Sequence, residues 1–445
     1  MEEHLRAPFC MKKYYGQQTE NAIQNFPFPV HKAQLELIYS IAQVKKAAAL
    51  AHKSAGEISQ TIADAMVTAC DEILEGILDD QFVTSAIQGG AGTSINMNVN
   101  EVVASRASEI CGQTVHPNDH VNKSQSTNDV NPSALKIATI KLTQILLINI
   151  DILINSFEEK AKEWKDIKKI GRTHIQDALP STLGSEFQAY ADIIKRDRRR
   201  IEETLPYLHD LNLGGTAIGN SINASQKYIE EVYKEINKIT KLPLKKSENL
   251  MSATQSSSDF CQLSSTINIL FTDLHKIAKD IRFLSSGPYG GIGEITVKEL
   301  QKGSSIMPGK INPVLPETIN QIAYDIMGKN LTIQQAAQNA NLQLSLMFPV
   351  LADSLITMLK VSATGIFVFA INCVQHLVAN PEKCKELLEN STVYATLLAP
   401  KLGYDTVSSI VKEGIKTKKP IRELVLEKKL LTQTEFDQLT NNHLQ

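Results

Sequence analysis

The stretch best equipped for chemistry is Gly303-Ser-Ser-Ile-Met-Pro-Gly-Lys-Ile-Asn-Pro313, where polar groups stand between glycines and prolines. Glycine and proline at this density exclude a continuous helix and a regular strand, so we expect a loop. Its functional side chains are two hydroxyls, one ammonium and one amide: Ser304, Ser305, Lys310 and Asn312. A mobile loop of this kind is suited to closing over a small anion, although the same composition is also typical of a solvated surface turn. The loop is not a phosphate-binding P-loop, because five residues separate its glycines and Ile311 follows the lysine.

Three further polar stretches are expected at helix termini: residues 90–98, 122–129 and 171–180. Their candidate functional side chains are Thr93, Ser126, Thr127, Asn128, Thr173 and His174. Each stretch also has a purely structural interpretation, since Ser-Thr-Asn-Asp before a long helix is first of all an N-cap. Taken with the loop, however, these groups form a set that can hold carboxylates through neutral donors and one cation, and can stabilise a developing oxyanion.

Composition excludes several classes of protein. The chain of 445 residues has a formal net charge of −2 and a pI near 6.6, which gives no electrostatic reason to bind nucleic acid or an anionic membrane. Six scattered cysteines include no C-x-x-C pair, so we expect free thiols and neither a disulfide framework nor a metal site. The N-terminal residues lack the apolar core of a signal peptide, and the most apolar run, residues 145–154, is too short to span a bilayer. We expect a soluble, cytoplasmic protein.

Hydrophobic periodicity predicts long helices and no strand. Apolar residues recur at three- and four-residue steps from His31 to about Leu78, and from Leu263 to Leu284 they form the seam of a bundle. Further long helices are expected over residues 131–164, 316–339 and 349–379, followed by short helices from about residue 380. Helices that are apolar on several faces cannot all be covered within one chain, so we expect a helical oligomer.

In their order and spacing these motifs resemble the aspartase/fumarase superfamily over nearly the whole chain. The matching stretches are the loop with Val314-Leu-Pro-Glu317, the three polar stretches, Tyr14-Tyr-Gly, Leu213-Gly-Gly-Thr-Ala-Ile-Gly219 and Leu284-Ser-Ser-Gly-Pro288. The resemblance implies an all-α chain of three domains (residues 1–115, 116–379 and 380–445) with a long central five-helix bundle. It also implies a homotetramer with a shared helical core, whose active sites each draw on three subunits.

The same resemblance implies a reaction and a role for each candidate residue. Members of the superfamily release fumarate by anti elimination from a small dicarboxylate, without any cofactor. Ser304 would be the base that removes a proton beside one carboxylate and generates an aci-carboxylate. That carboxylate would be held by Thr93, Ser126, Thr127 and Ser305, and the other carboxylate by Lys310, Asn312 and Thr173. Asn128 and His174 would contact the leaving group, with Glu317 orienting His174.

Details within the motifs favour the ammonia-releasing branch, with L-aspartate and fumarate as the small-molecule partners. Gly90-Ala-Gly-Thr-Ser-Ile-Asn96 and the pair Ser126-Thr127 resemble that branch rather than the fumarases. Some positions depart from the family pattern, with Asn21 and Tyr289 where arginines are usual and Phe348 where a charged residue is common. A neutral side chain cannot replace the guanidinium fork. Three alternatives therefore stay open: a fumarate hydratase, a lyase for a larger amine or a modified aspartate, and a catalytically silent structural oligomer.

Overall fold

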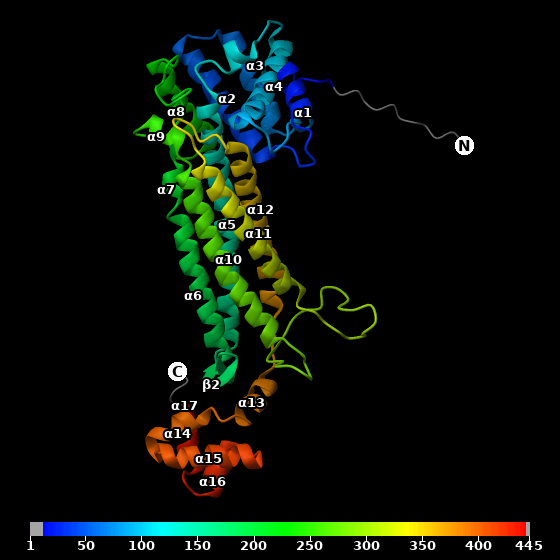
Figure 1. The fold of residues 1–445 in the computed structure, drawn as a ribbon, viewed down its shortest axis with the longest axis vertical. Helices are drawn as coiled ribbons and strands as arrows, with labels where there is room; N and C mark the ends of the chain where they lie inside the picture. Colours follow the sequence, from blue (N-terminus) through cyan, green and yellow to red (C-terminus); the bar gives the residue numbers. More distant parts are fainter. Residues whose placement is uncertain (1–11, 442–445) are drawn as a thin grey trace, which may run out of the picture. The chain divides into compact units, whose positions relative to one another are not determined.

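The computed structural model describes residues 12–441 and shows a chain made almost entirely of helices (Figure 1). The helices are α1 (Gln17–Asn25), α2 (Leu35–Ala55), α3 (Gln60–Leu74), α4 (Thr93–Cys111), α5 (Thr127–Glu163), α6 (Leu183–Glu202), α7 (Leu205–Leu208), α8 (Gln226–Thr240), α9 (Leu250–Gln255), α10 (Ser258–Leu284), α11 (Val314–Gln338), α12 (Phe348–Asn372), α13 (Pro381–Glu389), α14 (Tyr394–Leu402), α15 (Tyr404–Thr417), α16 (Ile421–Glu427) and α17 (Gln433–Asn441). Short turns of helix lie at Asp79–Gln81, Gly90–Gly92, Pro117–Val121 and Val374–His376. The all-α prediction is confirmed.

The predicted helices are present, with two differences near the N-terminus. The helical region expected from residue 31 to 78 is two helices, because Gly56 ends α2 in the left-handed conformation (φ 74°) and Ser59 then caps α3. The helix α1 lies in a segment that we expected to be irregular. Of the cysteines, Cys10 and the N-terminal segment lie outside the described residues, while the other five are free thiols.

The prediction of no strand is wrong, because three two-stranded sheets are present. The longest is the antiparallel hairpin of β1 (Lys168–Thr173) and β2 (Gln176–Thr182), and the others are β3 (Asp210–Leu211) with β4 (Lys245–Lys246) and β5 (Ile295–Thr296) with β6 (Val378–Ala379). Residues 171–180 are therefore a hairpin and not a helix terminus. A bulge between Gly171 and Arg172 interrupts the alternation of side chains by which a strand is recognised.

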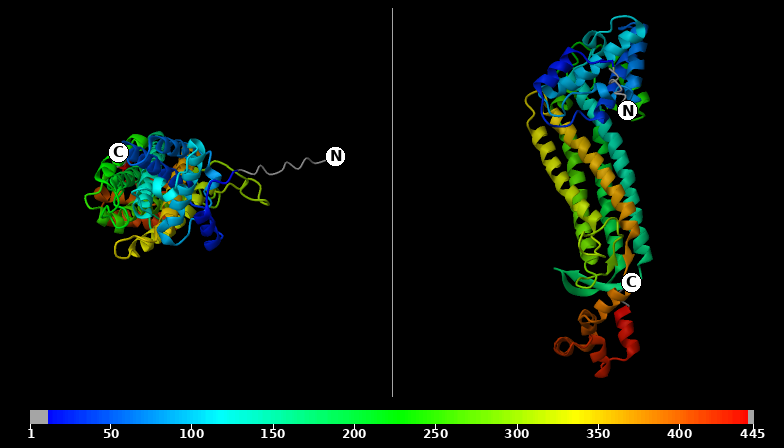
Figure 2. Two further views of the ribbon diagram at one scale, coloured as in Figure 1. Left: turned by 90° about the horizontal axis from the view of Figure 1, so that it is seen from above. Right: turned by 90° about the vertical axis from the view of Figure 1, so that its right-hand side faces the viewer.

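The chain divides into two compact units, each built from segments that are distant in sequence. Unit 1 comprises residues 1–146, 200–268 and 325–362. In it α2 packs against α3 and α8, and α3 packs against α4. The blue and cyan helices α2, α3 and α4 lie together in the right-hand view of Figure 2. The centre of α2 is rich in alanine, and Ala47, Ala48 and Ala49 are fully buried, which allows close approach of its neighbours.

Unit 2 comprises residues 147–199, 269–324 and 363–445. Segments of the five long helices α5, α6, α10, α11 and α12 contact one another in it. Phe157 and Trp164 of α5 pack edge-on against Phe187 of α6, and Asn149 of α5 donates to the carbonyl of Ala363 in α12 (2.9 Å). The short helices α14–α17 enclose a separate apolar core. The boundaries predicted for three domains stay a prediction.

Two segments, α5 and residues 348–376, are long and apolar enough to cross a membrane by length and composition alone. The same property is typical of the core helices of soluble bundles, and more than half of each apolar window is buried within this chain. Several large apolar side chains of the long helices are nevertheless exposed. They include Ile145, Ile148, Tyr324, Met327 and Leu331. A subunit interface would cover such a surface, and the oligomer stays a prediction.

Candidate active site

The loop of residues 303–313, in unit 2, places two backbone N–H groups on the oxygen of Ser304. Ser304 Oγ accepts from the N–H of Ile306 (3.2 Å) and from that of Met307 (3.2 Å). Donors of this kind stabilise negative charge on the oxygen they face. The two N–H groups therefore face the oxygen that would carry the charge if Ser304 were an alkoxide.

A second hydrogen bond closes the base of the loop. Asn312 donates from Nδ2 to the carbonyl of Gly303 (2.8 Å), and Gly303 lies so close to the Lys310 carbonyl that a side chain would overlap it. Ser305 and the Lys310 side chain are exposed. The polar groups identified from the sequence are therefore presented to solvent by a closed loop, and Asn312 both holds the loop and belongs to the predicted set.

Thr173 and His174 lie at the exposed tip of the β1–β2 hairpin, also in unit 2. Thr173 ends β1, and His174 (φ 54°) and Ile175 (φ 62°) form a two-residue turn with both φ angles positive. Glu317 lies in the first turn of α11, directly after the loop. No contact between Glu317 and His174 is observed among the described residues of this unit, so the orienting role of Glu317 stays a prediction.

A buried cluster of charges anchors the hairpin from behind. Glu294 is fully buried, and its carboxylate accepts from Arg172 Nη2 (2.9 Å) and lies 3.0 Å from Lys169 Nζ. Lys169 also pairs with Glu186 (2.6 Å). Arg172 directly precedes Thr173, and Glu294 precedes the strand β5 that leads to the loop, so one carboxylate fixes both segments.

In unit 1, Thr93 is the first residue of α4 and follows a turn of unusual conformation. Gly90 (φ 73°), Ala91 (φ 55°) and Gly92 (φ 84°) are all left-handed, and Thr93 Oγ1 donates to the carbonyl of Gly90 (2.6 Å). The buried side chain of Asn131, in α5, donates to the carbonyls of Ala91 (3.3 Å) and Gly92 (3.1 Å). A methyl group on Gly92 would lie 2.6 Å from the Asn131 amide nitrogen. Glycine is therefore required there both because a side chain would collide with Asn131 and because the φ angle is positive.

Ser126, Thr127 and Asn128 form the N-terminus of α5, and Asp129 holds them in place. The buried carboxylate of Asp129 accepts from the N–H of Ser126 (2.8 Å) and from those of Gly214 and Thr216 (3.0 Å each). Asn128 Nδ2 donates to the carbonyl of Ala217 (2.8 Å), which lies in the same loop as Gly214 and Thr216. Ser126 Oγ in turn accepts from the N–H of Asn128 (3.2 Å), so Ser126 and Asp129 cap the helix together. The N-cap and the ligand-binding interpretations are nevertheless compatible, because Ser126, Thr127 and Asn128 stay partly exposed.

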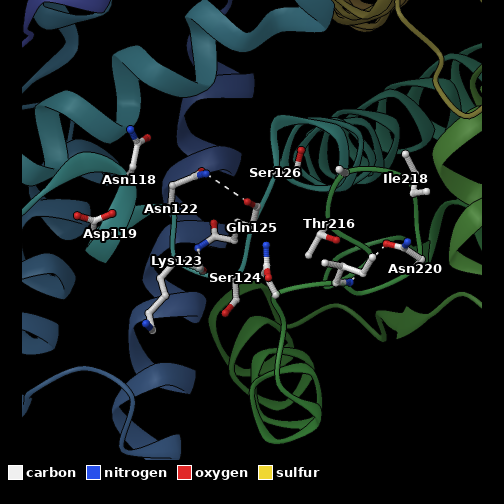
Figure 3. A pocket seen from close by; sticks show the side chains of 13 residues that line it. Asn118, Asp119, Asn122, Lys123, Ser124, Gln125, Ser126, Thr216, Ile218 and Asn220 are labelled. Atoms are coloured by element: carbon white, nitrogen blue, oxygen red, sulfur yellow. Dashed lines mark hydrogen bonds between the residues drawn. The ribbon is translucent and has the colours of Figure 1, made fainter.

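Residues in the ranges 118–126 and 216–223 line an open cavity of about 840 Å³ within unit 1. Figure 3 shows Asn122 and Lys123 on one side of this cavity and Thr216 and Asn220 on the other. Ser126 also lines it. Most of its lining side chains can form hydrogen bonds, and Ala217, Ile218 and Ile222 add apolar surface. Polar groups set in a partly apolar pocket are typical of small-molecule sites.

Behind the cavity wall lies a buried polar network centred on Lys45. Its Nζ donates to Asn122 Oδ1 (2.8 Å) and Gln125 Oε1 (3.0 Å), and Asn122 Oδ1 also accepts from Asn96 and Asn100 of α4. Burial lowers the pKa of Lys45 to about 7, although the charge of Asp129 raises it. Asparagine is unfavourable in a helix, and this network accounts for two of the three buried asparagines of α4, Asn96 and Asn100. The third, Asn98, bonds instead to the backbone of Gln81 and Val83.

The predicted residues fall into two groups, one in each unit. Thr93, Ser126, Thr127 and Asn128 lie in unit 1, and Thr173, His174, Ser304, Ser305, Lys310, Asn312 and Glu317 lie in unit 2. Sequence reasoning missed the residues that hold these groups, namely Lys45, Asn131, Arg172 and Glu294, and it gave Asp129 only the role of a helix cap. The only sequence signal for them is a polar residue in an otherwise apolar helix, as at Asn131.

Comparison with known proteins identifies the family. Residues 9–328 match the lyase family and residues 395–443 the fumarase C C-terminus. The chain belongs to the lyase family. It is 42% identical to the aspartate ammonia-lyase of Bacillus subtilis (strain 168) over 434 residues, which cover 96% of this chain and 91% of that one. It is 39% identical to the aspartate ammonia-lyase of Escherichia coli (strain K12) over 435 residues, with coverage of 96% and 91%.

Solved structures of the lyase family share the fold. A fumarate lyase/delta crystallin of Brucella melitensis superposes with a TM-score of 0.93 at 39% identity, covering 97% of this chain and 95% of that one. The class II fumarase of Schistosoma mansoni gives a TM-score of 0.92 at 35% identity, with the same coverage. The resemblance inferred from the motifs is therefore confirmed at the level of family and fold.

Proposed function

We propose that this lyase is an aspartate ammonia-lyase that converts L-aspartate reversibly into fumarate and ammonia. The observation that carries the proposal is the environment of Ser304, whose Oγ accepts two backbone N–H groups at 3.2 Å. A serine hydroxyl is a weak acid, and it serves as a base only where donors favour its alkoxide. Curated relatives that are about 40% identical over 96% of the chain and named aspartate ammonia-lyase support the choice of reaction.

In the proposed reaction the Ser304 alkoxide takes a proton from C3 of L-aspartate. The electron pair left on C3 delocalises into the adjacent carboxylate and gives an aci-carboxylate with two negative charges. That pair then forms the C2–C3 double bond of fumarate while the C2–N bond breaks and its electrons leave with nitrogen as ammonia. The proton held by Ser304 passes to solvent, where ammonia becomes ammonium.

Each carboxylate has its own set of donors in this proposal. Thr93, Ser126, Thr127 and Ser305 hold the carboxylate that becomes the aci form, where each well-placed donor contributes about 3 kcal/mol. Lys310, Asn312 and Thr173 hold the other carboxylate, and Asn128 and His174 contact the amino group. These assignments rest on the resemblance to the family and on the exposed or half-exposed positions of the side chains.

The test is fumarate formation, followed by ultraviolet absorbance, with L-aspartate and L-malate as alternative substrates. We expect L-aspartate to be preferred at least a hundredfold in kcat/KM, which corresponds to about 2.7 kcal/mol. The variant Ser304→Ala should be inactive with an unchanged fold. Preference for L-malate would identify a fumarate hydratase, and turnover of neither substrate would direct the search to N- or C3-substituted aspartates.

We also propose that four chains of 49.1 kDa assemble into a cytoplasmic homotetramer with composite active sites. The exposed apolar side chains of α5 and α11 support this assembly. Two inactive variants, Ser304→Ala and His174→Ala, are dissociated, mixed and then allowed to reassociate. Recovery of activity is expected if the two residues of a site come from different subunits, and none from verified mixed tetramers would place both in one chain.

A further inference from the structure

His52, near the end of α2, is buried against the loop that carries Ser126. Its side chain is fully buried, and its ring stacks on that of Tyr228 in α8 (centroids 4.3 Å apart, planes at 7°). Nε2 lies 2.9 Å from the carbonyl oxygen of Lys123, and Nδ1 lies 2.7 Å from Glu57 Oε2. Both ring nitrogens therefore face oxygen atoms.

This arrangement requires a proton that a neutral imidazole does not have. A carbonyl oxygen accepts only, and so does an ionised carboxylate, whereas a neutral ring carries a single N–H. Burial raises the pKa of Glu57, but hydrogen bonds from Ser225 and His52 outweigh burial, and the pKa is lowered. Glu57 is therefore ionised. His52 satisfies both contacts only as an imidazolium.

Rising pH removes one of the two contacts. Burial lowers the pKa of His52, against the raising effect of its bonds to Lys123 and Glu57. When the ring becomes neutral, its remaining proton stays on Nδ1, because a hydrogen bond to a carboxylate is roughly twice as strong as one to a carbonyl. The lone pair of Nε2 then faces the Lys123 carbonyl, and the two repel each other.

The contact that is lost is one of those that hold the cavity wall, beside the bonds from Lys45 to Asn122 and Gln125. Lys123 lies three residues before Ser126, and both line the cavity in unit 1. The Lys123 carbonyl also accepts from Gln125 Nε2 (3.1 Å), which ties it to the turn of residues 122–126. A displacement of this carbonyl moves the segment that enters α5.

We propose that His52 is a positioning residue, which fixes the 122–126 loop through the Lys123 carbonyl and thereby sets the affinity of Ser126 and Thr127 for a carboxylate. The second half of this statement rests on the proposed function, and the first does not. The titratable groups that face His52 are Glu57 from the turn after α2, Tyr228 from α8 and the Lys123 ammonium. Lys45 and Asp129 contact the same loop and also titrate near neutral pH, so any test must separate His52 from them.

The variant Glu57→Gln makes this separation. Its amide oxygen can still accept from Ser225 Oγ, as Glu57 Oε1 does (2.5 Å), while its NH₂ donates to Nδ1 of a neutral ring. Nε2–H is then free to donate to Lys123 at any pH, so the loop no longer needs the extra proton. Lys45 and Asp129 are the same in both proteins, so the effect of their titration cancels when wild type and Glu57→Gln are compared at one pH.

The experiment compares wild type and Glu57→Gln at pH 5.5 and 8.5, with the exposed Glu248→Gln as the matched control. The first readout is hydrogen exchange of peptides that span residues 118–126, compared at equal pH so that intrinsic exchange rates cancel. The second is KM for L-aspartate. At pH 5.5 we expect similar protection and similar KM in the two proteins. At pH 8.5 we expect weaker protection in wild type and a KM roughly fivefold higher than in Glu57→Gln, which is the change in affinity that the loss of one hydrogen bond produces.

Several outcomes overturn the proposal. It fails if the two proteins behave alike at both pH values, if their difference is independent of pH, or if Glu248→Gln reproduces the effect. A second variant, His52→Asn, should weaken protection at both pH values because the shorter amide cannot bridge Glu57 and Lys123, and wild-type protection in it would also count against the proposal. If L-aspartate is not turned over at all, the proposed function fails, while the exchange measurement still decides whether His52 positions the loop.

Discussion

Replacing Gly303 with alanine should lower activity about 100-fold and leave the fold intact. A Cβ atom at this position overlaps the Lys310 carbonyl oxygen and lies 2.8 Å from its carbon and 3.3 Å from Asn312 N, whereas ordinary contact begins at 3.4 Å. The two sides of the loop must therefore separate by roughly 1 Å, a misplacement that costs about 10²-fold in rate at an active site. The hydrogen bond from Asn312 to Gly303, at the base of the loop, would be lost with it.

The matched control is Gly290→Ala, since Gly290 lies in another loop of unit 2 and a Cβ there meets nothing within 4 Å. Steady-state kinetics and thermal unfolding would be measured for both variants. We expect kcat/KM to fall about 100-fold for Gly303→Ala, or about 2.7 kcal/mol, with a Tm within about 1 °C of wild type because the loop is exposed. Gly290→Ala should stay within about twofold in rate. A Gly303→Ala enzyme within threefold of wild type would show that the close approach of Gly303 to Lys310 does not position the catalytic groups.

Three further variants test the groups that bind substrate and the residues that hold them. Lys310→Ala should raise KM and lower kcat together, because a cation on a carboxylate acts in both the ground and transition states; an unchanged KM would exclude that role. Asp129→Asn keeps the shape of the side chain but places an NH₂ group opposite a backbone N–H. We expect the unfolding free energy, measured by denaturant titration, to fall by about 2–3 kcal/mol. An unchanged midpoint of the titration would refute this prediction. Gly92→Ala should lower Tm more than Gly112→Ala does, because both positions have positive φ but only at Gly92 does a Cβ collide with Asn131; equal losses would mean that strain alone matters.

How far the sequence predicted the structure depended on the range of the interactions involved. The loop around Ser304 follows from local composition, and the long helices follow from a periodicity repeated over many turns, so both could be predicted. The hairpin that carries His174 could not, because a bulge interrupts its alternation and its strands are stabilised by the buried Arg172–Glu294 pair, which joins residues 122 positions apart. Asp129 was assigned to a helix cap, yet two of its three bonds go to a loop more than eighty residues away. No single-sequence pattern records such partners.

The turn that carries His174 has a consequence for how this enzyme can change over evolutionary time. Both of its residues have positive φ, which costs an L-residue other than glycine about 1 kcal/mol, and Ile175 is β-branched and 69% exposed. An Asn-Gly pair would suit this backbone better. Selection for stability alone should therefore drive these positions toward Asn and Gly and discard the imidazole. If His174 has the role proposed for it, retention of histidine against that pressure records continued selection for catalysis, and its loss in a descendant would be an early mark of recruitment to a purely structural use.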